Sequence, residues 1–435
     1  MSAKIKAAAS DVRMPWYERL FSVKPAEIRM VCWAFLYIFS LFLAYYVLRP
    51  IRDELGVAGG VRNLPWLFGG TLLAMIAVSP LFAWVVKRLP RGRFVPLCYR
   101  FFMLHLILFA LLTAFAPSAW QLWTGRIFFI WVSVFNLFVV SVFWSFAVDI
   151  FSEAQSKRLF GLLAAGATLG GIAGSALTSA LVEHIGQIWL MAVSVALLEL
   201  AVQSAKRLEQ YGDAQEDKQT RQAQAKPVGG GLLSGMKHTF SSPYLCGIAL
   251  FILGYAMTGT ILYFHQAALA EQYFTDRVGR TAFFAEIDLW VNALTLLFQL
   301  FLTGKLMGKL GITLLLCILP LVSMAGFGAL ALAPASLGLF VAVQVIRRVV
   351  NFAFARPARE VLYTAVSRED RYKTKNFIDT VVYRSGDQIA GWSYAGLLAL
   401  GLGSSTIAAI AVPFCAIWLL LAWWLGRQQA RGKAQ

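Results

Sequence analysis

Apolar runs of about 20 residues recur along this chain of 435, and they limit what it can fold into more than any other feature. A helix needs about 20 residues to cross a hydrocarbon core of ~30 Å, so each run predicts one spanning helix. Apolar residues make up 59% of the sequence and charged residues only 14%. A water-soluble chain of this length does not carry such proportions.

The predicted fold is an all-α, polytopic membrane protein with twelve transmembrane helices, and the lipid bilayer is its first expected partner. Residues 1–27 are polar and basic, and the first run is long enough to remain as a span, so we expect no cleaved signal. The twelve runs lie near residues 28–49, 63–86, 94–116, 120–149, 159–183, 186–205, 242–266, 280–304, 311–333, 335–355, 376–400 and 403–426.

The net charge of +17 raises the question of a nucleic-acid partner, which the distribution of basic residues answers. Basic residues crowd both ends of the chain and every second loop. By the positive-inside rule, this pattern predicts a multi-pass protein of the cytoplasmic (inner) membrane with both termini cytoplasmic. We expect no nucleic-acid partner. The segment from Arg49 to Arg62 is the exception, because its arginines fall on the outer side.

The chain divides into two halves at its longest polar interval. Residues 206–241 are rich in charge, glutamine and glycine, which cannot supply a packed core, so this interval predicts a cytoplasmic linker. It separates a six-helix bundle in residues 1–205 from another in residues 242–435. Two pseudo-symmetric bundles of six are the layout of major-facilitator-type transporters, whose substrate site lies between the halves. We expect a monomer.

Span ten places two adjacent arginines deep in the bilayer. Twelve residues at ~1.5 Å each put Arg348 about 18 Å from the outer end of the span, close to the middle of the core. A charge facing lipid there costs about 2.5–3.5 kcal/mol, so it indicates a cavity. Gln344, Arg348 and Asn351 share one helical face, which we predict to line that cavity. Arg347 points about 100° away, and we expect it to pair with a carboxylate on another helix.

Other charged residues lie inside neighbouring spans. Span eleven contains Asp379, Arg384 and Asp387. The alternative interpretation of such polar residues is hydrogen bonding between helices, worth about 0.6 kcal/mol each, and for single Ser, Thr and Asn residues it is the better one. By the same argument Gly166, Gly170 and Gly174 in span five indicate close helix packing. In span eight one stripe is polar and indicates a wet interior: Asp288, Asn292, Thr295 and Gln299.

Signatures of enzymes, metals and cofactors are missing. The sequence contains no GxxxxGK[ST], HExxH or GxSxG motif, and its four histidines are scattered. The five cysteines lie in predicted spans without CxxC spacing, so they predict neither a zinc site nor a disulfide framework. We therefore expect no enzyme, no catalytic residue, no metal and no cofactor. Transport would be driven by exchange or by an ion gradient.

Four stretches resemble the ATP/ADP antiporters, the nucleotide transporters of bacteria and plastids, and most closely their relatives in free-living bacteria. The first is LRPIRDEL (48–55), with Arg52 where a lysine is usual. The others are FWSFAVDIFSEAQSKRLFG (143–161), residues 282–311, and residues 354–387, which contain FARPAREVLY. The resemblance implies a major-facilitator fold and secondary active transport. Asp387 stands where a lysine is usual, which reverses one charge of the expected site.

Guanidinium groups suit phosphate and carboxylate geometry, so arginines on spans one, ten and eleven predict a small-molecule anionic substrate. The candidate substrate contacts are Arg49, Arg52, Gln344, Arg348, Asn351 and Arg384. The candidates for ion-pair switching or proton coupling are Asp53, Asp288, Asp379 and Asp387. The candidate cytoplasmic gate consists of Lys157, Arg158, Arg359, Lys373 and Lys375.

The leading hypothesis is a secondary transporter that moves an anionic or phosphorylated organic solute, including a nucleotide, by alternating access. A second hypothesis is a proton-coupled carrier of a metal chelate, peptide or cell-wall fragment, in which the carboxylates dominate. A third is a membrane sensor or assembly factor that transports nothing. Exchange of adenine nucleotides separates the first two, and a change in accessibility between the two sides excludes the third.

Overall fold

The computed structural model describes residues 23–88, 91–213, 239–363 and 377–431, together with residues 236, 366, 374 and 375. Within these residues the regular structure is helical, which confirms the all-α prediction. The first half contains η1 (Pro25–Glu27), α2 (Ile28–Ala58), η2 (Val61–Asn63), α3 (Leu64–Arg88), α4 (Arg91–Phe115), α5 (Ser118–Ile150) and α6 (Glu153–Asp213). The second half contains α9 (Pro243–Tyr273), α10 (Arg277–Phe298), η3 (Gln299–Thr303), α11 (Gly304–Leu332), α12 (Leu337–Val350), η4 (Asn351–Ala355), α13 (Arg356–Leu362), η6 (Ile378–Val382), α15 (Tyr383–Ala399) and α16 (Ser404–Ala430).

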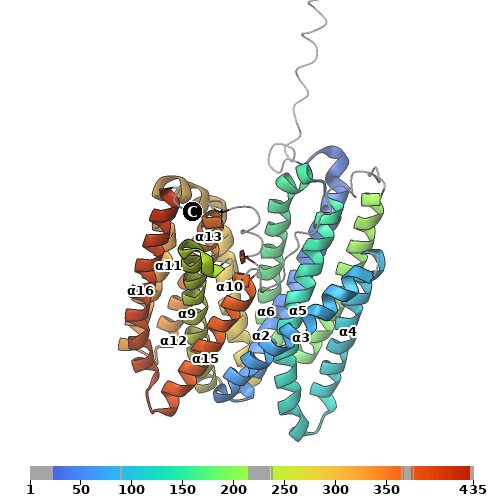
Figure 1. Cartoon of the computed structure of the whole chain (residues 1–435). Coiled ribbons are helices and arrows are strands. Elements are labelled where there is room, and N and C mark those ends of the chain that lie inside the picture. The colour runs from blue at the N-terminus through green and yellow to red at the C-terminus, as the bar shows by residue number, and fades with distance from the viewer. Residues whose placement is uncertain are drawn as a thin grey trace, which may run out of the picture.

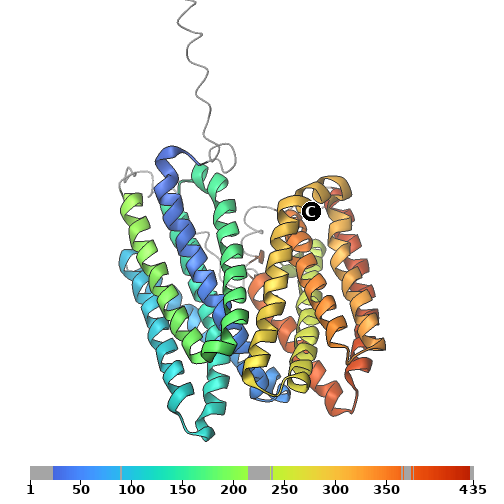
Figure 2. The same cartoon turned by 180° about the vertical axis from the view of Figure 1, so that it is seen from behind.

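Two of these helices reverse direction at a glycine. Gly186 in α6 has φ +73°, and Gly311 in α11 has φ +72°. Glycine adopts a positive φ without the Cβ clash that other residues meet, so the chain can turn back there. In consequence α6 crosses the bilayer twice, and Figure 2 shows its two green legs meeting in the lower half of the molecule.

The reversal in α6 explains the number of spans. Among the described residues, ten helical segments are long and apolar enough to cross a membrane, and α6 is a single one of them. The segment formed by η6 and α15 is not among the ten, and it carries Asp379, Arg384 and Asp387. Counting α6 twice and adding this polar segment gives the predicted twelve.

The helices form two bundles, α2–α6 and α9–α16, which stand side by side in Figure 1. The start of α2 and the end of α16 lie at the same end of the molecule, at the top of Figure 1, which we call the terminal face. The bundles lean together toward the opposite face. There α2, α3 and α6 contact α9, α10 and α15. Since α6 continues to Asp213 and residues 214–235 lie outside the described part, the linker limits of 206 and 241 remain a prediction.

Helix α2 contains an internal proline near the opposite face. Pro50 has no N–H, so the hydrogen bond that an amide at this position would donate to the carbonyl of Tyr46 is missing. The helix continues past this point to Ala58. Residues on both sides of Pro50 belong to the candidate site described below.

The glycines of α6 allow close approach to α2, which confirms the predicted packing role. A Cβ at Gly170 would lie 2.4 Å from the carbonyl oxygen of Phe39, and one at Gly174 would lie 2.6 Å from that of Leu43. Both contacts are with backbone, which a rotamer change cannot relieve. The first leg of α6 is therefore pressed against α2 along its small residues.

Gly170→Ala is expected to lower the stability of the purified protein by about 2 kcal/mol, because the added methyl group forces the backbones of α2 and α6 apart. Thermal unfolding in detergent measures the effect. The matched control is Gly161→Ala in the same helix, where no atom lies within 4 Å of the added Cβ. Alanine there is expected to be neutral or to stabilise the helix by about 0.5–1 kcal/mol. Equal melting temperatures of the two variants would contradict the packing argument.

Candidate substrate cavity between the two bundles

A cavity of about 680 Å³ lies between the two bundles. Its walls come from α2, α3 and α5 on one side and from α9, α10, α12, η4, α13, η6 and α15 on the other. All the predicted substrate contacts and coupling carboxylates line it: Arg49, Arg52, Gln344, Arg348, Asn351 and Arg384, with Asp53, Asp288, Asp379 and Asp387. Helical periodicity alone had placed Gln344, Arg348 and Asn351 on one face. Their contact with a substrate stays a prediction.

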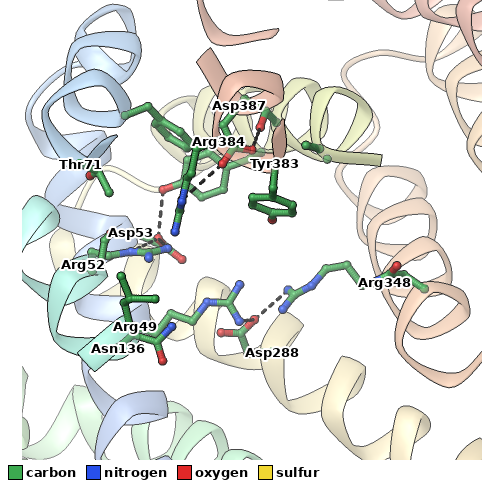
Figure 3. A pocket seen from close by; sticks show the side chains of 18 of the residues that line it. Arg49, Arg52, Asp53, Thr71, Asn136, Asp288, Arg348, Tyr383, Arg384 and Asp387 are labelled. Carbon is green, nitrogen blue, oxygen red and sulfur yellow. Dashed lines mark hydrogen bonds and ion pairs between the residues drawn. The ribbon is translucent and has the colours of Figure 1, made fainter. Parts of the chain in front are cut away.

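Asp288 lines the cavity from α10 and joins the two bundles. Its Oδ1 accepts from Nη1 of Arg49, at 3.0 Å, and from Nη1 of Arg348, at 2.7 Å (Figure 3). Arg49 comes from α2, whereas Arg348 comes from α12. The side chain of Asp288 is 3% exposed, and its Oδ2 has no hydrogen-bond partner among the described residues. One carboxylate therefore neutralises two guanidinium groups, and the triad keeps one positive charge.

Two further ion pairs line the cavity. Arg52 donates to Asp53 at 2.6 Å, and the hydroxyl of Tyr263 in α9 donates to the same carboxylate oxygen at 3.0 Å. Arg384 contacts Asp387 at 3.3 Å. Figure 3 shows Arg52 and Asp53 next to Arg49, and Arg384 and Asp387 further up in the view. The aspartate that replaces the usual lysine thus neutralises Arg384 and does not stand alone.

The charges of the cavity do not cancel. Seven arginines and four aspartates line it, which leaves a net charge of +3, and no lysine, glutamate or histidine is among the lining residues. Each predicted arginine has a carboxylate partner, but a chamber open to a ligand lies beside the pairs. In a low-dielectric surrounding, an excess of guanidinium groups attracts an anion strongly. The arrangement can therefore bind a molecule that carries several negative charges.

The bonding partners of Arg347 differ from the predicted one. It donates to the carbonyl oxygen of Tyr255 at 2.9 Å and to the hydroxyl of Thr258 at 2.7 Å, and it lies over the Tyr255 ring. Among the described residues no carboxylate lies within ion-pair distance, so the prediction of a carboxylate partner was wrong. The offset of about 100° from Arg348 points this side chain at α9, where uncharged oxygens and an aromatic ring receive it.

The sequence pattern of the Major Facilitator Superfamily matches residues 30–386. The chain belongs to the major facilitator superfamily. It is a multi-pass membrane transporter, and the predicted two-bundle fold is confirmed. The match covers most of both halves, including every residue of the Asp288 triad.

Relatives of this major facilitator are distant in sequence and close in length. The ADP,ATP carrier protein 2 of Chlamydia pneumoniae is 21% identical over 480 residues, covering 91% of this chain and 87% of that protein, which supports the resemblance drawn from the four stretches. A bacterial homolog of the human lysosomal transporter Spinster, solved inward-facing and unoccupied, matches with a TM-score of 0.59 and 15% identity over 94% of this chain and 99% of that one. The nucleoside transporter NupG matches with a TM-score of 0.61 and 12% identity over 92% and 98%.

Three of the five predicted gate residues of this major facilitator have described side chains, and these form pairs within their own bundles. Arg158 contacts Glu27 at 2.8 Å, both in the first bundle. In the second bundle, Lys375 bonds to Glu360, and Arg359 lies 3.7 Å from Asp379. Arg359 also lines the cavity. The side chain of Lys157 and the whole of Lys373 lie outside the described part of the chain, and the gate stays a prediction.

A cluster around Glu54 joins the bundles near the opposite face, and the sequence analysis did not single it out. Glu54 is fully buried at the end of α2 and contacts Arg280 of α10 at 3.1 Å. Gln187, which follows the reversal of α6, donates to Glu54 at 2.9 Å and to Thr281 at 2.8 Å. We call these four residues the Glu54 cluster. It joins the bundles, and the signal for it was a glutamate inside the span-end motif LRPIRDEL.

Glu54→Gln is expected to shift the protein toward a state open at the opposite face by at least tenfold, because the neutral amide loses the charge-assisted bond to Arg280. The measurement is the labelling rate of a cysteine introduced at Thr71 in the cavity, with a membrane-impermeant reagent added to either side. Glu183→Gln, an exposed carboxyl at the end of the first leg of α6, is the control. Unchanged labelling from both sides would show that the Glu54 cluster does not hold the opposite face closed.

Proposed function

We propose that this major facilitator moves an anionic or phosphorylated organic solute across the cytoplasmic membrane by alternating access. The observation that carries the proposal is the net charge of +3 in a cavity between the bundles, with the Asp288 triad bridging them. A charged phosphate or carboxylate can take the place of Asp288 on Arg49 and Arg348. The solute and the protein carboxylate would then compete for the same guanidinium groups.

A nucleotide fits this class. The relative from Chlamydia pneumoniae is named as an ADP,ATP carrier, and the cavity of this chain offers aromatic rings beside its arginines. Tyr45, Tyr46 and Phe42 line it from α2, and Tyr255 and Tyr383 line it from the other bundle. Rings of this kind stack on the face of a nucleobase. The arginines would hold the phosphate groups, and the rings would hold the base.

The described state supports access from the terminal face. The Glu54 cluster joins the bundles at the opposite face, whereas the described pairs of Arg359 and Lys375 stay within one bundle. We assign the terminal face to the cytoplasm, in line with the basic residues at both ends of the chain and in every second loop. The state would then be inward-facing, as is the Spinster homolog that it resembles in fold.

Counterflow in proteoliposomes tests the proposal. Vesicles loaded with unlabelled ATP, ADP, a sugar phosphate or a dicarboxylate are given the same solute in labelled form outside. Transient accumulation of one of these anions supports the proposal. Accumulation of none of them, together with uptake of a neutral or cationic peptide driven by a proton gradient, would instead support a proton-coupled carrier in which the carboxylates dominate.

A further inference from the structure

The flank of the first bundle carries an ion pair in a place where charge is costly. Arg100 of α4 contacts Glu199 in the second leg of α6 at 2.8 Å, and their side chains are 49% and 37% exposed. Both residues lie inside candidate membrane spans, Arg93–Phe115 and Arg158–Tyr211. Figures 1 and 2 show α4 and this leg of α6 on the side facing away from the other bundle. The pair therefore faces the lipid and belongs to no wall of the substrate cavity.

The Arg100–Glu199 pair leaves hydrogen-bonding capacity unused. A guanidinium has five N–H donors, and the bonds to Glu199 among the described residues use two of them. Hydrocarbon offers no acceptor for the remaining donors, so leaving them unpaired costs free energy. Glu199 also accepts from Gln203, which draws a third polar side chain to the same spot.

An apolar groove of about 220 Å³ continues from the pair along the same two helices. On α4, Ile107 and Leu111 lie seven and eleven residues after Arg100, so all three share one helical face. On α6, Val195, Ala192 and Ile188 lie four, seven and eleven residues before Glu199 and share its face in the same way. The groove is lined by Leu106, Ile107, Ala110, Leu111, Ile188, Trp189, Met191, Ala192 and Val195. A charged end is thus joined to an apolar channel that runs away from the terminal face.

We infer that this surface is a binding site for a zwitterionic phospholipid with a primary ammonium headgroup, phosphatidylethanolamine in class. The phosphate accepts from the free donors of Arg100, the ammonium donates to Glu199, and one acyl chain lies in the groove. The charges select the headgroup. An anionic lipid without an ammonium places negative charge beside Glu199, and a choline headgroup has no N–H to donate.

Native mass spectrometry of the full-length protein in detergent tests the site. Phosphatidylethanolamine, phosphatidylglycerol and phosphatidylcholine with identical acyl chains are added in turn at equal concentration. We expect one phosphatidylethanolamine to be retained about tenfold better than either other lipid, the effect of one charge-assisted hydrogen bond. Equal retention of all three lipids, or a dimer of the chain formed through this flank in place of a lipid adduct, would overturn the inference.

Variants separate lipid binding from a merely structural ion pair. Glu199→Gln should lower the retention of phosphatidylethanolamine about tenfold and leave that of phosphatidylglycerol within twofold or higher. Arg100→Gln should lower the retention of both lipids, because both phosphates accept from Arg100. Glu286→Gln removes an exposed carboxyl from α10 in the other bundle and should change neither. A structural pair alone would lower the melting temperature without altering the ratio of the lipids.

A second variant leaves the ion pair intact. Ala192→Trp fills the groove from an exposed position, so the protein should still fold. This variant should also lower lipid retention. Full retention in this variant would show that the groove holds no acyl chain. All of these experiments measure lipid binding and not transport. They therefore remain interpretable if the proposed substrate class is wrong.

Discussion

Arg348→Ala is expected to weaken anion binding by about 100-fold or more. Arg348 supplies the shorter of the two bonds to Asp288 and is the arginine of the second bundle at the centre of the cavity. Removing one member of a buried, hydrogen-bonded charge pair costs about 2–5 kcal/mol. The cavity charge falls from +3 to +2, and the anion loses a bidentate partner. Counterflow of the labelled solute and the thermal shift that it causes in purified protein measure the loss.

The conservative and remote variants make the result specific. Arg348→Lys keeps the charge but loses the planar fork, so binding should be intermediate. Arg62→Ala removes an exposed arginine from η2, outside the cavity, and should bind the solute as the unmodified protein does. If Arg348→Ala keeps the full thermal shift, Arg348 does not contact the solute and the central anion site is wrong.

Asp288→Asn is expected to separate exchange from net transport. Without the carboxylate, Arg49 and Arg348 face each other unneutralised, and the cavity charge rises from +3 to +4. An anion should then bind at least tenfold more tightly, whereas the empty protein loses the pair that joins its bundles. Reorientation of the loaded protein remains possible, and reorientation of the empty one becomes unfavourable. We expect counterflow to persist and net uptake into unloaded vesicles to fall at least 50-fold.

The same variant carries a stability cost that can be measured separately. Breaking a buried ion pair by removing one partner costs about 3–5 kcal/mol. The melting temperature of Asp288→Asn without ligand should therefore drop, and saturating anion should restore most of the loss. Equal losses of counterflow and net uptake would show that Asp288 has another role, such as carrying the coupled proton. Asn292→Ala, one turn further along α10 and outside the cavity lining, is the matched control.

Helix positions were predictable from the sequence because hydrocarbon imposes a length on every spanning segment. The cavity face of α12 was equally predictable, since a period of 3.6 residues brings Gln344, Arg348 and Asn351 together. The partners of the charged residues were not. Arg49 and Arg348 are about 300 positions apart in the chain, and only the packing of the bundles shows that they share Asp288.

Tyrosines illustrate a second limit of the sequence. Tyr255, Tyr263 and Tyr383 line the cavity, but aromatic residues also gather at membrane interfaces and on lipid-facing surfaces, so their presence in a span carries no information on its own. The role of Glu54 could not be predicted from the sequence either. The carboxylate of Glu54 lies directly after Asp53 in the chain, yet it is absent from the cavity lining and bonds to Arg280, because consecutive residues of a helix point about 100° apart.

Pro50 divides α2 into two stretches that both contact the other bundle. Before it Arg49 bonds to Asp288, and after it Asp53 bonds to Tyr263 and Glu54 bonds to Arg280. The missing backbone hydrogen bond weakens the helix here, and bends in long helices occur at such prolines. When the opposite face opens, α2 can therefore bend at Pro50, next to Arg49. A solute that binds to the guanidinium of Arg49 would first displace residues 51–58.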